Sequence, residues 1–211
     1  LYVRALSDDV PRAVPGISSD QTIGEISFSP DSQSIVFHSR SDDQLKRIAV
    51  TGGSPVVICR SAFASGVSWH GKELFFVEPG RGILRVDAAG GEPRVAVELE
   101  AGTSAQNPSL LPDQEHLLFT LARGDAPDRW DRGEVVLQSL RTGQRRVLLR
   151  GGADARYVPT GHIVYAFGGA LYAVAFDSKQ LRVIGEPVAV ISGVRRGVAE
   201  ITGNAQYAFS S

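Results

Sequence analysis

A short pattern recurs five times along this 211-residue chain, and it constrains the fold more than any other feature of the sequence. Each copy is a short apolar strand, a turn rich in Pro, Asp or Gly, and a second apolar run that ends in an aromatic residue. These aromatic residues are Phe37, Phe76, Phe119, Tyr165 and Phe209, spaced 39, 43, 46 and 44 residues apart. A period of this length, with several strands in each period, is typical of the blades of a β-propeller.

Each full period divides into four predicted strands joined by tight turns. The four predicted blades span approximately residues 24–59, 65–98, 107–150 and 154–191. Glycine pairs such as Gly52-Gly53 and Gly90-Gly91 supply the positive φ angles that hairpin turns require. No helical periodicity is sustained for three turns. The sequence therefore predicts an all-β chain of four-stranded antiparallel blades, in one domain over residues 1–211.

The two ends of the chain break the repeat in the middle of a blade. Residues 1–6 and 11–15 have the pattern of third and fourth strands, whereas residues 197–211 have the pattern of first and second strands. Together they predict a composite blade, 197–211 plus 1–16, which would be the fifth blade of a closed ring and leave the chain monomeric. The alternative is a fragment of a propeller with six or more blades, whose open edges would pair between copies as a homo-oligomer.

Composition argues against several classes of partner. Charged residues make up 21 % of the chain and the net charge is −1, so neither nucleic acid nor direct membrane contact is expected. No apolar stretch is long enough to span a membrane, and no signal peptide is present. The single cysteine, Cys59, ends an apolar run and is expected to be a buried structural thiol. The absence of methionine and the abrupt start suggest an excerpt from a larger polypeptide.

Several segments resemble those of TolB-like propellers, particularly the ones found C-terminal to bacterial eukaryotic-like serine/threonine kinases. The segments are Phe28-Ser29-Pro30-Asp31, residues 45–53 and residues 84–93. The resemblance implies a domain beyond a membrane helix that senses a ligand or binds a partner. It also implies an extracytoplasmic (periplasmic) location in a membrane-anchored protein, with a cytoplasmic location left open. The chain itself carries no kinase motif.

The strongest irregularity is a polar insertion at residues 123–134, between the second and third strands of the third blade. Three interpretations stay open. It could be a solvated loop paired with itself, or a partner contact in which Trp130 stacks and Arg129 or Arg132 binds a carboxylate or phosphate. It could also be a calcium site built from Asp125, Asp128 and Asp131, although their spacing matches no calcium loop. No metal and no cofactor are predicted.

Carboxylates near the starts of the inner strands form a second group of candidates. The residues are Glu25, Asp154 and Glu200, with Asn107 on the remaining full blade. Two carboxyl groups about 5 to 9 Å apart could serve a carbohydrate-active enzyme. Polar residues at inner-strand starts are also ordinary on any propeller, and no catalytic role can be assigned to any of them. The chain has no Gly-x-Ser-x-Gly motif for a serine nucleophile.

The histidines are expected to be structural or exposed to solvent. His116 and His162 share one repeat position at the start of a second strand, on the face opposite the insertion and on different blades, so they are not expected to share a metal.

The sequence thus predicts a non-catalytic module of a larger bacterial protein that senses a ligand or binds a protein. The expected partner is a protein or small molecule on the propeller face that carries the insertion and the inner-strand starts. The alternatives are a carbohydrate-active enzyme, and a structural scaffold or self-assembling propeller fragment.

Overall fold

The computed structural model describes residues 1–211 except residues 6, 19, 197–201, 210 and 211. Its regular structure is almost entirely β, with one short 3-10 helix, η1 (Pro127–Trp130). Among the described residues, no helix has the length and hydrophobicity needed to cross a membrane.

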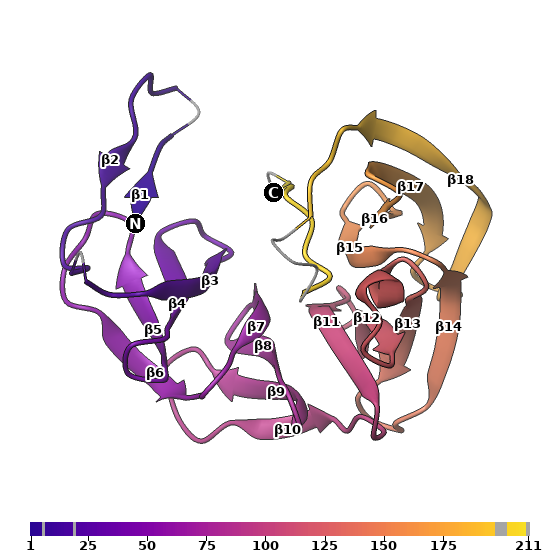
Figure 1. Cartoon of the computed structure of the whole chain (residues 1–211), viewed down its shortest axis with the longest axis horizontal. Helices are drawn as coiled ribbons and strands as arrows, with labels where there is room; N and C mark the ends of the chain where they lie inside the picture. Colours follow the sequence, from indigo (N-terminus) through magenta and orange to yellow (C-terminus); the bar gives the residue numbers. More distant parts are fainter. Residues whose placement is uncertain (6, 19, 197–201, 210–211) are drawn as a thin grey trace. The chain divides into compact units, whose positions relative to one another are not determined.

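Four sheets each contain four strands that follow one another along the chain (Figure 1). The first holds β3 (Ile23–Phe28), β4 (Ser34–Ser39), β5 (Gln44–Ala49) and β6 (Val56–Arg60); the second holds β7 (Ser65–His70), β8 (Glu73–Glu78), β9 (Gly82–Asp87) and β10 (Arg94–Val97). The third holds β11 (Thr103–Leu110), β12 (His116–Arg123), β13 (Glu134–Ser139) and β14 (Arg145–Arg150); the fourth holds β15 (Ala153–Val158), β16 (His162–Phe167), β17 (Ala170–Asp177) and β18 (Arg182–Ser192). This arrangement confirms the predicted all-β propeller fold.

The chain forms two compact units, which are described separately here. The first contains residues 1–78 and 84–94, and the second contains residues 79–83 and 95–211. The core of the first unit includes Val36, Leu45, Leu74 and Phe76, all fully buried. Cys59 lies in the same cluster, with its thiol buried and outside any disulfide, as the sequence predicts.

A two-stranded hairpin, β1 (Tyr2–Val3) paired with β2 (Arg12–Ala13), lies in the first unit. The glycine turn after β5 meets the chain just beyond β2, where the Gly53 amide donates to the Pro15 carbonyl at 3.1 Å. The glycine turn after β9 contacts β6 in the same way, through the Gly91 amide and the Ile58 carbonyl at 3.1 Å. Since β6 is the outer strand of its blade, the equivalent contact is the one expected if β2 is the outer strand of a preceding blade.

The composite blade as a whole stays a prediction. Part of the second segment that it requires lies outside the described residues, at 197–201, 210 and 211. Within its described part, residues 202–209, there is no strand, and Ala205 makes an isolated bridge with Arg196.

In the four four-stranded sheets that the structure describes, the first strand, which we call the inner strand (β3, β7, β11 or β15), carries a β-bulge at the same place. Two residues of the inner strand face one residue of its neighbour, at 24–25 opposite His38, 66–67 opposite Phe76, 107–108 opposite Phe119 and 154–155 opposite Tyr165. In the first blade, buried His38 takes the place of the aromatic residue, and its Nε2 donates to the Ser61 carbonyl at 2.9 Å. Phe37 is therefore not the equivalent of Phe76, and that part of the predicted alignment was one residue out.

Candidate functional site

The start of β15 forms the centre of a polar cluster in the second unit. Asp154 occupies the first bulge position with a positive φ of 52° and is fully buried. Arg156, two residues along the strand, binds both of its carboxylate oxygens, from Nε to Oδ1 at 2.8 Å and from Nη2 to Oδ2 at 3.1 Å. The backbone amide of Ala205 donates to Oδ2 at 2.9 Å. Each of these contacts of the carboxylate is therefore made by the chain itself.

Burial raises the pKa of Asp154 above its ordinary value, although Arg156 and the Ala205 amide both oppose the shift. Asn107 also lowers the pKa of Asp154, though by less than the other groups, so its side chain is close enough to affect the carboxyl group. The structure thus brings together two of the predicted inner-strand candidates, Asp154 and Asn107.

Residues 202–209, which we call the C-terminal segment, cover this cluster. Asn204 accepts a hydrogen bond from the side chain of Gln106, and the Tyr207 hydroxyl donates to the Asp154 carbonyl. The Arg156 guanidinium lies 4.4 Å from the centre of the Tyr207 ring, a cation–π contact. Burial, and after it the nearby Asp154 carboxylate, raise the pKa of Tyr207 well above its usual value. The place expected to receive a ligand is occupied by the chain's own backbone.

The insertion contributes its tryptophan to the same cluster. Trp130, at the end of η1, is only 2 % exposed and packs with Ala122 and Ala153. A Cβ added to Gly203 would lie 2.9 Å from a ring atom of Trp130, so only glycine fits there without a shift. The expectation that Trp130 stacks on a ligand is therefore wrong, because the ring is a core residue that packs against the C-terminal segment.

The charged residues of the insertion are largely paired within the chain. Arg132 binds Asp128 at 2.7 Å, and Arg196 binds Asp131. Arg129 donates to the Ala126 carbonyl at 3.3 Å and lies 5.4 Å from the Trp130 ring centre. The contacts of Arg132 and Arg129 lie within the insertion and agree with a self-paired loop, whereas Arg196 ties Asp131 to a later part of the chain.

No predicted calcium site forms from the insertion. Among the described residues, no group of three or more His, Cys, Asp or Glu side chains could hold a metal ion. Asp128 and Asp131 are each bound by an arginine, and Asp125 is not joined to them in such a group.

The remaining inner-strand candidates are Glu200 and Glu25. Glu200 lies outside the described residues. Glu25, in the first unit, is the second residue of its bulge and so corresponds to Ala155, whereas Gly24 corresponds to Asp154. The predicted equivalence of Glu25 and Asp154 was therefore one residue out, because the extra residue of the bulge is invisible in the pattern of apolar and polar residues.

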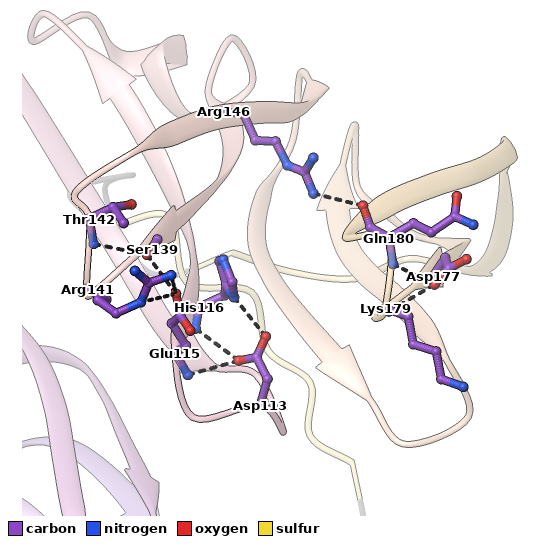
Figure 2. A network of polar contacts seen from close by, with 10 residues as sticks. All are labelled: Asp113, Glu115, His116, Ser139, Arg141, Thr142, Arg146, Asp177, Lys179 and Gln180. Atoms are coloured by element: carbon purple, nitrogen blue, oxygen red, sulfur yellow. Dashed lines mark hydrogen bonds and ion pairs between the residues drawn. The ribbon is translucent and has the colours of Figure 1, made fainter.

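A groove that was not predicted from the sequence lies between two turns of the second unit. One turn joins β11 to β12, and the other joins β17 to β18 (Figure 2). The groove has a volume of about 470 Å³. Its lining residues, which define what we call the turn groove, are Leu111, Pro112, Asp113, His116, Ser178, Lys179 and Leu181.

Asp113 and His116 form an oriented pair on one side of the turn groove (Figure 2). The His116 ring nitrogen Nδ1 lies 2.8 Å from Asp113 Oδ2, while the backbone amides of Glu115 and His116 donate to Oδ1 at 2.9 and 3.0 Å. Burial acts to raise the pKa of Asp113, but these hydrogen bonds together outweigh it and hold the pKa below its ordinary value. An ionised Asp113 places the imidazole proton on Nδ1 and leaves Nε2 as an acceptor when the ring is neutral.

Lys179 extends from the opposite turn (Figure 2). The Asp177 carboxylate shapes that turn by accepting the amides of Lys179 and Gln180, both at 2.9 Å. Arg146 of β14 donates to the Gln180 carbonyl at 3.4 Å, which ties the third blade to this turn of the fourth. The signal that could have revealed the groove is the shared repeat position of His116. The other side of the groove, however, is lined by Ser178, Lys179 and Leu181 of the next blade.

Comparison with known proteins places the chain by fold. No protein-family model and no curated protein matches the sequence. Among solved structures, an oligogalacturonate lyase from Vibrio parahaemolyticus is similar with a TM-score of 0.58 at 10 % identity, covering 89 % of this chain and 58 % of that chain. The calcium-binding protein regucalcin from Agrobacterium tumefaciens gives 0.56 at 14 %, covering 79 % and 58 %. An auxiliary nutrient binding protein from Bacteroides ovatus gives 0.60 at 13 %, covering 88 % and 44 %.

These similarities support the β-propeller fold and, at such low identity, nothing finer. The chain spans 44 to 58 % of the length of these three structures. They include both an enzyme and binding proteins, so they favour neither function for this chain.

Proposed function

We propose that this chain is a non-catalytic protein-interaction module, and that it binds an extended segment of a partner protein along the free edge of β18. The observation that carries the proposal is the apolar character of that edge. Ile184, Val188, Val190 and Ile191 are 49, 63, 53 and 56 % exposed. β18 is the last strand of its sheet and, at 11 residues, is much longer than the other outer strands.

The contrast with β14, the outer strand of the preceding blade, supports this proposal. β14 carries Arg145, Arg146 and Arg150 in six residues, and charges of this kind normally protect a sheet edge from pairing with another chain. Residues 187–192 of β18 carry none. Pro187 has no amide to donate, so the stretch that can pair with a partner strand is 188–192.

Two further features favour binding over catalysis. The Asp154 carboxylate is bound by Arg156 and Ala205, and the C-terminal segment covers it. Asp154, the inner-strand carboxylate of this unit that the structure describes, is therefore engaged in holding the fold.

The test begins with random peptides displayed on phage and selected on the purified chain. We expect selected peptides to alternate apolar residues and to bind less tightly to Val190→Lys by about tenfold, since a charge would be buried at the interface. Val147→Lys, which changes an exposed valine on β14, is the matched control and should bind as the unaltered chain does. N-methylation of alternate peptide amides should abolish binding. Peptides that bind both variants equally would contradict the proposal.

The wider context is proposed from the resemblance to TolB-like propellers. We infer that the module belongs to a larger, membrane-anchored bacterial protein and lies outside the cytoplasm, in the sensor position of a receptor-like kinase. The flanking sequence of the parent gene tests this inference. A kinase domain followed by a membrane helix upstream would support it, and flanking sequence without either would contradict it.

A further inference from the structure

We propose that the turn groove binds a small organic anion that carries both a carboxylate and a hydroxyl group on an apolar body. This site lies apart from the edge of β18 and does not depend on the function proposed above.

The groove has the size and lining of a small-molecule site. Its volume of about 470 Å³ falls within the range of about 300–1,000 Å³ that is usual for such pockets. Exposed Pro112 and half-buried Leu181 provide an apolar surface, whereas Leu111, only 1 % exposed, is already covered by the chain. An apolar ligand body would cover this surface, which is otherwise open to water.

Lys179 supplies the charge that would select an anion. Among the described residues its ammonium group makes no hydrogen bond, although its charge helps the Gln180 amide to lower the pKa of nearby Asp177. Its flexible side chain points away from Asp113 and His116 in Figure 2. The other charged residue of the groove, Asp113, already accepts three hydrogen bonds. A carboxylate can therefore pair with Lys179, while Asp113 offers little to a cation because its oxygens are occupied.

His116 supplies the second point of recognition. Asp113 holds Nδ1, so the other ring nitrogen of the neutral imidazole accepts a hydrogen bond. A ligand hydroxyl is the donor that fits this acceptor. The side chain of His116 is 19 % exposed, which leaves it accessible from the groove while its orientation is fixed. Asp113 is thus a positioning residue, and Lys179 and His116 are the contact residues.

The probes are 4-hydroxybenzoate and benzoate, which differ only in the hydroxyl group. Titration of the 15N-labelled chain at neutral pH, followed by NMR, gives both the location and the dissociation constant. We expect shifts at residues 111–116 and 178–181, and tighter binding of 4-hydroxybenzoate. Lys179→Gln should weaken both probes by about fivefold, as expected for a partly exposed ion pair. Lys72→Gln, which removes the same charge from an exposed turn of the first unit, should change neither.

His116→Gln should remove the preference for 4-hydroxybenzoate and leave benzoate binding nearly unchanged. Asp113→Asn, which frees the ring without removing it, should reduce the same preference and retain the effect of Lys179→Gln. The absence of shifts at millimolar probe would overturn the proposal. So would equal effects of Lys179→Gln and Lys72→Gln, or a hydroxyl preference that survives both changes at 113 and 116.

Discussion

At the scale of single residues, Asp154 is the point where contacts from β15 and the C-terminal segment converge. Its side chain is fully buried, whereas that of Arg156 is 35 % exposed. Removing Arg156 therefore leaves a buried carboxylate, whereas removing the Asp154 carboxylate leaves a partly exposed guanidinium. A buried carboxylate without its cation keeps its full desolvation cost, but a partly exposed guanidinium can turn toward water.

We expect Arg156→Met to lower the free energy of unfolding by about 3 kcal/mol at neutral pH, and Asp154→Asn by only about 1 to 2 kcal/mol. Arg156 is the main factor that lowers the pKa of Asp154 against burial, so its loss raises that pKa further. The proton is then held more strongly in the folded than in the unfolded chain, and the deficit of Arg156→Met should shrink as pH falls toward about 4. Urea denaturation at several pH values measures both effects.

The double variant, Asp154→Asn with Arg156→Met, is the control. In that background the arginine has no carboxylate to neutralise, so its replacement should cost little and should lose its pH dependence. If Arg156→Met proves cheaper than Asp154→Asn at neutral pH, Asp154 is not an ionised group that depends on Arg156.

At the scale of elements, the glycine turns after β5 and β9 each contact a strand that precedes their own blade, through the Pro15 and Ile58 carbonyls. Gly16 and Gly53 meet at such a junction, and both have positive φ, 95° and 123°. A Cβ on Gly16 would lie 1.7 Å from the Gly53 carbonyl oxygen, whereas a Cβ on Gly53 would meet nothing within 4 Å. Substitution of Gly53 therefore tests the backbone conformation alone, whereas substitution of Gly16 adds a steric overlap.

We expect Gly53→Ala to cost about 1 kcal/mol, the penalty for alanine at positive φ. Gly16→Ala should cost clearly more, because alanine there also forces β2 away from the turn. Hydrogen exchange gives a local readout, since the Val14 amide donates to the Leu1 carbonyl across the hairpin. Its protection should fall in Gly16→Ala and persist in Gly53→Ala. Equal losses in both variants would mean that this junction does not hold the hairpin.

The elements were predictable to the extent that local chemistry determines them. Alternating apolar residues and turns such as Gly52-Gly53 indicate strands and hairpins without any tertiary information. The bulges were not predictable, because Asp154 is polar and buried at positive φ through contacts made 51 residues away, with Ala205. Trp130 was misassigned for the same reason, since the residues that bury it, among them Gly203, are distant in sequence. The turn groove forms between turns of two blades that lie side by side. The periodicity of the sequence does not show which turns of neighbouring blades meet.

At the scale of the whole molecule, the two-stranded hairpin and the C-terminal segment raise the question of how the fifth blade is completed. We expect the chain to complete it internally and to sediment as a monomer at all concentrations, because strands on one chain meet at a higher effective concentration than strands on two. Sedimentation velocity over a wide concentration range checks this. Dimers that grow with concentration would contradict it, and their loss in Val190→Lys would assign them to the edge of β18.

The bulge that every inner strand carries has a consequence for how substitutions will be tolerated. Side chains along a strand alternate between faces, and one extra residue reverses that alternation. In β11, positions before Asn107 and after Pro108 are therefore out of phase with each other. A saturation scan of any inner strand should therefore show the positions that tolerate substitution changing from odd to even numbers at the bulge. The side chains on either side of the bulge then follow opposite alternations, although the strand itself is continuous.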